Sequence, residues 1–356
     1  IFLFMTASIG FVSGFLVADE SMLEAYDESF EKYRIENGNF TLDSQATEEK
    51  LEELEQEGVT IYENFYLDEP VDVDLDGTSD GTMRIFKKRE EVNLVCLMKG
   101  TFPETADEIA IDRMYADNNS LAVGDTITVG GKELKITGLV ALSDYSALFQ
   151  NNNDSMFDSV KFGVGIVTPE EFETLDQEKL QYNYAWIYDQ QPVDEKEEKE
   201  VSEDLMEDIG KVVNLETFVP RYLNQAIIFT GDDMGGDKAM VVMLLYIVIV
   251  IMAFVFGITI SNTIRKEAGV IGTLRASGYT RRELILHYMT LPVLVTLIGA
   301  LIGNILGYTV FKGVCAGMYY GSYSLPTYVT IWNAEAFLLT TVVPVIITIL
   351  INYAVL

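Results

Sequence analysis

The fold is decided by the stretch Asn262-Thr-Ile-Arg-Lys-Glu-Ala-Gly-Val-Ile-Gly-Thr-Leu-Arg-Ala-Ser-Gly-Tyr-Thr-Arg-Arg-Glu-Leu284, a basic segment between two apolar runs. The run before it, Ala239–Ser261, and the run after it, Tyr288–Phe311, contain no charged residue. A helix rises about 1.5 Å per residue, so each run is long enough to cross a hydrocarbon core about 30 Å thick. The sequence therefore predicts a membrane protein in which this basic segment joins two spans.

Four apolar runs predict transmembrane helices over residues 1–17, 239–261, 288–311 and 336–356. The chain begins with Ile1 and ends within an apolar run, so we expect a piece of a longer protein with a truncated first span. A signal peptide is the alternative for the first run, but that run lacks a basic n-region and a clear cleavage site. We therefore interpret it as a span.

The charge is divided unevenly along the chain. Residues 19–238 contain 52 acidic and 18 basic residues, whereas 262–287 contain five basic and two acidic ones. Short loops rich in Lys and Arg stay in the cytoplasm. This places 262–287 inside and both 18–238 and the loop 312–335 outside. So large a negative charge argues against nucleic acid as a partner.

The predicted outer domain, residues 18–238, is large enough for its own core. Alternating and helical patterns predict two strand–helix–strand units, over 39–42, 46–57 and 59–67, and over 182–188, 193–209 and 212–218. A β-rich insertion of about 84–167 lies between them. Within it, Thr126–Val129 and Lys132–Gly138 flank Gly130-Gly131, which predicts a two-residue hairpin. The predicted fold class is thus four transmembrane α-helices plus a large α+β domain between the first and second helices.

The sequence gives no support for catalysis. No P-loop is present, and His287 is the one histidine. Asp72-Val-Asp-Leu-Asp-Gly77 resembles the start of a calcium loop, but Met83 stands where an EF-hand needs glutamate. We interpret it as an exposed strand entering a turn and expect no metal site. Cys96 and Cys315 are interpreted as isolated buried thiols, with a disulfide between them as the alternative.

Glycines recur at four-residue spacing in two spans: Gly10 and Gly14 in the first, and Gly299, Gly303 and Gly307 in the third. Small residues let membrane helices approach closely, so we expect packing faces there. The alternative is that glycine is simply common in membrane helices. Asn304 and Asn352 offer hydrogen bonds between helices.

The segment 262–287 has the pattern of a helix, a turn and a second helix start. Apolar residues at helical spacing predict a short amphipathic helix that Gly278 ends. Thr280 and Glu283 predict a capping box for the next helix. The segment is then either a rigid cytoplasmic knob that docks on a partner or a surface helix held by anionic lipid.

Ile264-Arg-Lys-Glu-Ala-Gly-Val-Ile-Gly-Thr-Leu-Arg-Ala-Ser-Gly-Tyr-Thr-Arg-Arg-Glu-Leu-Ile285 resembles the coupling segment of FtsX-like permeases, the membrane subunits of MacB-type (type VII) ABC transporters. Leu121–Ile127, Ile136–Val140 and Ser143–Tyr145 resemble the family's extracytoplasmic core domain. The resemblance covers the whole chain. It implies a MacB-like core domain over 18–238, with a porter-like α/β part and an inserted β-rich part, and an FtsX-like permease domain over 239–356.

The resemblance also implies a function. A separate cytoplasmic ABC ATPase would bind ATP and Mg²⁺, and no cofactor is expected on this chain. The chain would be a multi-pass permease of the bacterial cell membrane, not an enzyme, that transmits ATP-driven motion to its outer domain. It would export or extract a peptide, antibiotic or lipid-linked substrate, paired with a second permease half or a second copy. The alternative is a regulator of an outer partner such as a cell-wall hydrolase. The residues expected to dock the ATPase are Glu267, Ile271, Leu274, Arg275, Ala276, Gly278 and Arg282.

Overall fold

The computed structural model describes residues 2–55 and 58–355, and the chain divides into two compact units. The helical unit comprises Ile1–Leu23, Asp233–Tyr319 and Tyr328–Leu356, and the α/β unit comprises Glu24–Asp232 and Tyr320–Thr327. Three ends of predicted elements lie outside the described residues: Ile1, Leu356 and positions 56–57 of the predicted 46–57 helix.

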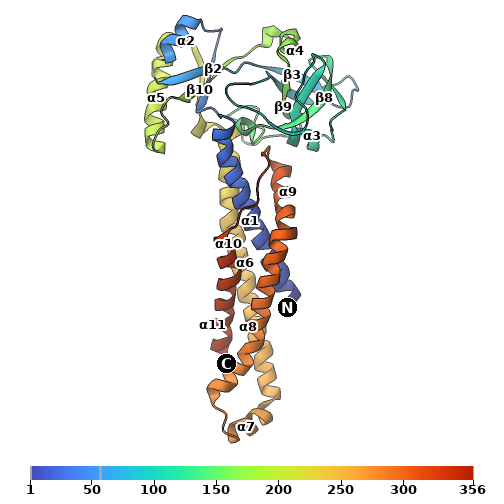
Figure 1. Cartoon of the computed structure of the whole chain (residues 1–356), viewed down its shortest axis with the longest axis vertical. Coiled ribbons are helices and arrows are strands. Elements are labelled where there is room, and N and C mark those ends of the chain that lie inside the picture. Colours follow the sequence, from blue (N-terminus) through green and yellow to red (C-terminus); the bar gives the residue numbers. More distant parts are fainter. Residues whose placement is uncertain (1, 56–57, 356) are drawn as a thin grey trace. The chain divides into compact units, whose positions relative to one another are not determined.

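Four helical stretches are long and apolar enough to cross a membrane (Figure 1). Two of them are the single helices α1 (Phe2–Lys32) and α6 (Gln225–Lys266). The third is α8 (Arg281–Leu306), which continues through the π-helical η4 (Gly307–Phe311) into α9 (Lys312–Ser322). The fourth joins α10 (Ala334–Phe337), the π-helical η5 (Leu338–Val342) and α11 (Val343–Val355). The short helix α7 (Ala268–Ala276) connects α6 to α8.

Two helical stretches run further than the predicted spans. Helix α6 begins at Gln225, before the predicted start at Ala239, and the third stretch continues past Phe311 to Ser322. The predicted loop 312–335 therefore begins as a helix. The predicted ends were placed where charges appear, but Lys and Glu are good helix formers and end a hydrophobic run without ending the helix.

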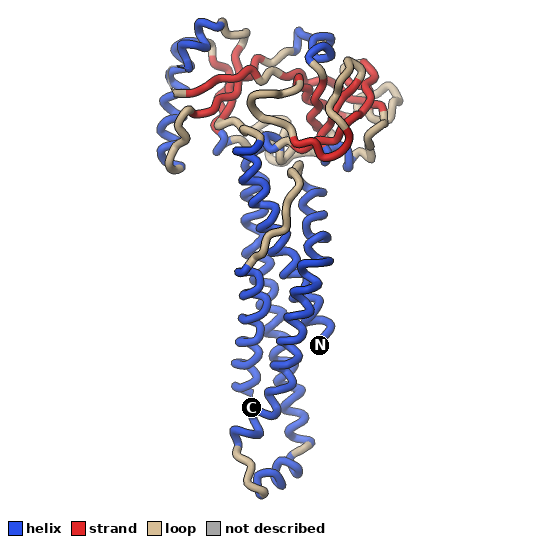
Figure 2. The backbone as a smooth tube through the Cα atoms, viewed as in Figure 1, coloured by secondary structure: helices blue, strands red, loops and turns tan. Residues whose placement is uncertain are grey.

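The α/β unit contains two sheets (Figure 2). The smaller one has the order β11-β1-β10-β2 with antiparallel neighbours. Its elements are β1 (Gly38–Leu42), α2 (Glu48–Glu55), β2 (Val59–Glu63), β10 (Tyr182–Tyr188), α5 (Glu195–Val212) and β11 (Leu215–Pro220). The two predicted strand–helix–strand units thus interleave in one sheet. Phe40, Tyr184 and Trp186 on one face share a buried apolar core with Leu54 of α2 and Leu205 of α5.

The larger sheet has the order β5-β8-β6-β9-β4-β3-β7. Strand β7 also pairs with β8, which closes six of the strands into a barrel. The strands are β3 (Tyr66–Asp72), β4 (Gly81–Lys87), β5 (Cys96–Gly100), β6 (Glu108–Asp112), β7 (Thr126–Val129), β8 (Lys132–Ala141) and β9 (Phe162–Val167). Helices α3 (Arg113–Asn118) and α4 (Pro169–Thr174) accompany them.

The barrel begins earlier than the predicted insertion. The predicted strand 59–67 divides at Asn64-Phe65, where the chain leaves the small sheet and enters the barrel. The alternating pattern runs through this point, so it could not reveal the change of partner strand. The hairpin prediction is confirmed: Val129 pairs with Lys132, and Gly130 and Gly131 have φ of +59° and +82°.

Each of the two units contains one cysteine. Cys96 begins β5 and Cys315 lies in α9, and both are free and buried. The interpretation as isolated thiols is therefore confirmed, and the disulfide alternative is wrong.

Candidate functional site

The connection between α7 and α8 is fixed by hydrogen bonds of its own backbone. Gly278 takes a φ of +103°, a conformation that favours glycine. The N–H of Tyr279 donates to the Leu274 carbonyl, and the N–H of Gly278 donates to the Arg275 carbonyl, each at 3.1 Å. These are the two bonds of a Schellman motif, which confirms the predicted helix stop at Gly278.

The start of α8 carries the predicted capping box. The backbone N–H of Glu283 donates to the Thr280 hydroxyl oxygen at 3.3 Å. The Thr280 N–H donates in return to the Glu283 carboxylate at 2.7 Å. Both sides of the turn are therefore held by bonds within residues 274–283.

A further hydrogen bond ties the start of α7 to α8. Glu267 occupies the N-cap position of α7, and its Oε2 accepts a hydrogen bond of 2.7 Å from the Tyr288 hydroxyl. Sequence reasoning missed Tyr288, because no local pattern signals a contact between residues 21 positions apart. With this bond, the segment is braced at its beginning as well as at its turn.

The residues predicted to dock an ATPase all lie in this helix–turn–helix segment. Ile271 and Leu274 are half-buried. The other five are exposed: Glu267, Arg275, Ala276, Gly278 and Arg282. The segment therefore exposes basic side chains, while backbone groups at its helix ends already have hydrogen-bond partners. The docking role of these residues stays a prediction.

Two of the glycines of α8 and η4 lie against α1. A Cβ added to Gly303 would lie 2.9 Å from Cγ2 of Ile9, and one added to Gly307 would lie 2.8 Å from Cβ of Ser13. Real Cβ atoms do not approach so closely, so larger residues would force the helices apart. The backbones approach here because both positions are glycine.

The glycines of α1 face the same stretch. A Cβ on Gly14 would lie 2.5 Å from Cβ of Phe311, and one on Gly10 would lie 3.0 Å from the Phe311 ring. Gly299 has more room, since the nearest atom to its added Cβ is the Thr6 hydroxyl at 3.4 Å. Paired positions increase together along both helices, so α1 and α8 run in the same direction.

Asn304 joins three helical stretches. Its Oδ1 accepts hydrogen bonds from the hydroxyls of Ser13 in α1 (2.8 Å) and Thr340 in η5 (3.1 Å). Its Nδ2 donates to the Thr341 hydroxyl and to the Ala300 carbonyl, both at 2.9 Å. The carboxamide thereby makes two bonds as acceptor and two as donor, which fills its ordinary capacity.

The expectation for Asn352 is wrong for the residues described. Its Nδ2 donates to the Thr348 carbonyl within α11 (2.8 Å), and its Oδ1 has no partner in the described ranges. The link between α8 and α11 is made by Thr296 and Thr348, whose hydroxyl oxygens lie 3.2 Å apart. Their short side chains gave no signal within the apolar runs.

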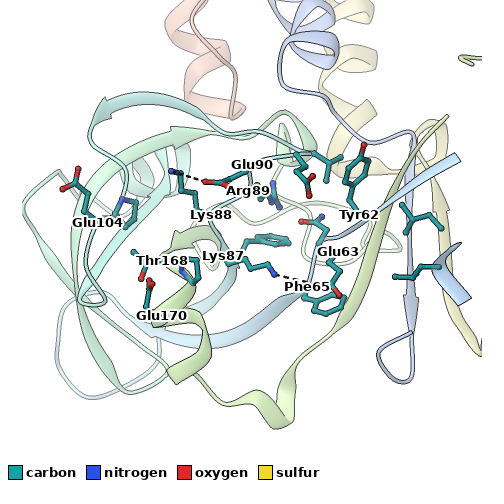
Figure 3. Close-up of a pocket in the computed structure, with 18 residues that line it drawn as sticks. Tyr62, Glu63, Phe65, Lys87, Lys88, Arg89, Glu90, Glu104, Thr168 and Glu170 are labelled. Carbon is teal, nitrogen blue, oxygen red and sulfur yellow. Dashed lines mark ion pairs between the residues drawn. The ribbon is translucent and has the colours of Figure 1, made fainter. Parts of the chain in front are cut away.

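The α/β unit has a cavity of about 1090 Å³, lined by residues of β2, β4 and the start of α4 (Figure 3). Lys87, Lys88 and Arg89 line it in succession. The Lys87 ammonium lies 3.9 Å from the Glu63 carboxylate, and that of Lys88 lies 3.7 Å from Glu90. Nearby carboxylates thus balance the lysines, and the cavity does not concentrate positive charge.

Arg89, one of the residues that line this cavity, belongs to a buried group of charges. Its Nη1 donates to Oδ2 of Asp144 at 2.7 Å, and both side chains are almost fully buried. Burial raises the pKa of Asp144, and the Arg89 charge opposes that effect. Burial also raises the pKa of Glu36 to about 7, although Asn39 and Asn93 donate hydrogen bonds to its carboxylate.

The acidic stretch after β3 is a loop, so the predicted exposed strand is wrong beyond Asp72. Leu75 has a φ of +61°, which a strand does not allow. Carboxylate oxygens of Asp72, Asp74 and Asp80 lie within 4.8 Å of one another. Asp72 accepts a hydrogen bond from the Gly77 N–H at 2.8 Å, so its carboxylate stabilises the turn. Exposed acidic groups of this kind do not by themselves identify a metal site.

Comparison with known proteins gives one family. The model of the FtsX-like permease C-terminal family matches residues 242–356. No curated protein matches the chain. The solved structures that are similar at low identity include two with a TM-score of 0.30.

The first is the extracellular domain of the noncanonic ABC-type transporter YknZ from Gram-positive bacteria, at 12% identity over 51% of this chain and 98% of that chain. The second is the periplasmic region of MacB from Actinobacillus actinomycetemcomitans, at 11% identity over 52% of this chain and 91% of that chain. The family match covers the segment between α6 and α8 together with the helices α8 to α11. Residues 242–356 of this chain are therefore similar to the C-terminal domain of FtsX-like permeases.

Proposed function

We propose that the chain is the permease subunit of a MacB-type ABC transporter, and that residues 262–287 dock on a separate cytoplasmic ATPase. Motion driven by ATP hydrolysis would pass through the helices to the α/β unit. The work done would be export or extraction of a peptide, antibiotic or lipid-linked substrate.

The observation that carries this proposal is the bracing of the coupling segment, which we define as residues 262–287. A Schellman motif, a capping box and the Glu267–Tyr288 hydrogen bond all hold it, yet its basic side chains are exposed. A rigid exposed element transmits force from a partner, whereas a flexible loop absorbs it. Its position inside a family-matched permease domain supports the same role.

The charge distribution supports an orientation. Five basic residues in 262–287 favour the cytoplasmic side, and the acidic 18–238 region would then lie outside. ATP and Mg²⁺ would bind to the ATPase. Exposed apolar residues on α6, such as Met243, Ile247 and Ile251, would contact lipid, a second permease half or a second copy of this chain.

Copurification with the cognate ABC ATPase tests the docking role. Arg275→Glu reverses one exposed charge of the segment without entering a packed core, and we expect it to reduce ATPase retention at least tenfold. Lys211→Glu makes the same change on an exposed residue of α5 and should leave retention unchanged. Full retention by Arg275→Glu would contradict the docking assignment.

Transport by the reconstituted complex tests the function itself. We expect ATP-dependent substrate release to fail with Arg275→Glu in proportion to lost ATPase retention. A complex that assembles and hydrolyses ATP but moves none of the peptide, antibiotic or lipid-linked substrates offered would favour a regulatory role.

A further inference from the structure

The α/β unit has a second cavity, of about 500 Å³, and the four-stranded sheet forms its floor. The strand register places Thr217, Thr41 and Asn183 side by side across β11, β1 and β10. Asn39 lies in the next row of the same face. The aromatic residues alternate to the other face, which packs on the core with α2 and α5. The floor is therefore polar, and the volume is typical of small-ligand sites.

The loop Gln150-Asn-Asn-Asn153 also lines this cavity. Asn152 anchors the loop, because its Oδ1 accepts a hydrogen bond of 2.8 Å from the Gln225 backbone N–H and its carbonyl accepts another from the Gln225 side chain. The side chains of Gln150 and Asn153 make no hydrogen bond with residues 2–55 or 58–355. An anchored loop thus presents carboxamides whose donors and acceptors are available.

Each charged side chain of the cavity wall is held by at least one other residue. The Arg84 guanidinium donates two hydrogen bonds of 2.8 Å to the Asp68 carboxylate. Asp144 pairs with Arg89 through its Oδ2, while its buried Oδ1 has no hydrogen-bond partner among the described residues, and Glu36 accepts hydrogen bonds from two asparagines. An anionic ligand would find no unpaired cation here, and both carboxyl groups are buried with partners of their own, so the cavity favours an uncharged ligand.

The aromatic rings at the cavity are also occupied. The Arg84 guanidinium lies 4.0 Å from the centre of the Tyr66 ring, and the Phe218 ring stacks on Trp186 at 4.6 Å. A saccharide site normally offers an open aromatic face for stacking. A carboxamide instead offers a coplanar donor and acceptor, which is the pair that a peptide group needs.

We propose that this cavity binds an uncharged, extended peptide segment, held by the carboxamides of Gln150 and Asn153 and by the polar floor. This binding requires neither an ATPase nor nucleotide, so it is a function beyond ATPase docking. It can hold or fail independently of the permease proposal.

The test uses the full chain in lipid nanodiscs without ATPase. The probe is a library of N-acetylated, C-amidated pentapeptides of Gly, Ala, Ser, Thr and Asn, and retained peptides are quantified by mass spectrometry. We expect retention by the unmodified chain, at least a tenfold loss with the double variant Gln150→Ala/Asn153→Ala, and complete loss with Thr217→Trp, which fills the cavity. Asn214→Ala removes an exposed carboxamide outside the cavity and should retain the peptides.

Three results would overturn the proposal. The first is no retention by the unmodified chain, shown to be folded by circular dichroism. The second is retention that Thr217→Trp and the double variant leave unchanged. The third is retention of maltopentaose, but not of the peptides, that is lost with Thr217→Trp; this would assign the cavity to a saccharide instead.

Discussion

The coupling segment is shaped by hydrogen bonds between residues close in sequence, whereas the 500 Å³ cavity of the α/β unit is shaped by pairing of distant strands. The hydrogen bonds that shape the turn of the coupling segment join residues within 274–283. The cavity floor instead pairs Asn39 with Val219 and Thr41 with Thr217 through strand register. Local elements follow rules that can be read along the chain, whereas the cavity exists only once distant strands have paired.

If long-range pairs hold the α/β unit together, removal of Arg89 should have the largest effect. Arg89→Met leaves Asp144 buried without its partner, and we expect a loss of about 3–5 kcal/mol in the free energy of unfolding. Denaturant unfolding followed by Trp186 fluorescence in a Trp332→Phe background measures it. Lys196→Met breaks the exposed pair with Glu200 and should cost under about 0.5 kcal/mol. Equal costs for the two would contradict the assignment.

The pH dependence of the same transition tests Glu36. Burial raises its pKa from 4.5 to about 7, so the folded state binds the proton more tightly than the unfolded state. Its contribution to stability is complete below pH 4.5 and is lost as the pH rises through 7, a change on the order of 3 kcal/mol. Glu36→Gln should reduce the pH dependence of the free energy of unfolding over this range, whereas Glu48→Gln on α2 should not. An unchanged slope in Glu36→Gln would show that another group titrates.

The contact between α1 and α8 is a long-range contact within the helical unit. Gly303→Leu would push against Ile9, and we expect it to destabilise the unit by about 1–3 kcal/mol. Gly317→Leu enters open space on α9 and serves as the control. Thermal unfolding in detergent, followed by circular dichroism, compares them. A Gly303→Leu variant as stable as the control would mean that the helices separate without cost.

The smallest expected loss of stability is that caused by removal of the local cap at the start of α8. Thr280→Ala removes the cap of α8 and should cost about 1 kcal/mol. Hydrogen exchange at the first turn of α8 should accelerate, while α11 stays unchanged. Thr273→Ala, which removes a hydroxyl bonded within α7, should leave that turn unaffected. Faster exchange throughout α8 would indicate that the cap controls more than its own end.

The fold could be predicted where one residue or one turn determines the local structure. The Gly130-Gly131 hairpin and the two strand–helix–strand units followed from alternation and turn residues. The break at Asn64 and the closure of the barrel by β7 and β8 did not, because the same alternating pattern serves either sheet. The end of the third span was set too early, because the charge of Lys312 was taken as the end of the helix.

The candidate site divides in the same way. The stop at Gly278 and the Thr280 cap were predictable because they follow local hydrogen-bond rules. The Glu267–Tyr288 bond and the Ser13–Asn304 bond depend on how helices pack, and short hydroxyl side chains within apolar runs give no sign of their partners. The cavity carboxamides lay in a stretch with no recognisable pattern.

The two π-helical segments determine where this protein tolerates a change in length. In each, the i→i+5 hydrogen bonds of a π-helix accommodate one residue more than the i→i+4 bonds of the α-helix around it. Loss of a single codon within 307–311 could be absorbed by conversion of η4 to α-helix, which keeps Cys315, Ala316 and Tyr319 of α9 on the buried side. The same deletion elsewhere in α8 would turn the following residues by about 100° and move that face out of its buried position. Natural variation in the length of this span is therefore expected to concentrate at η4.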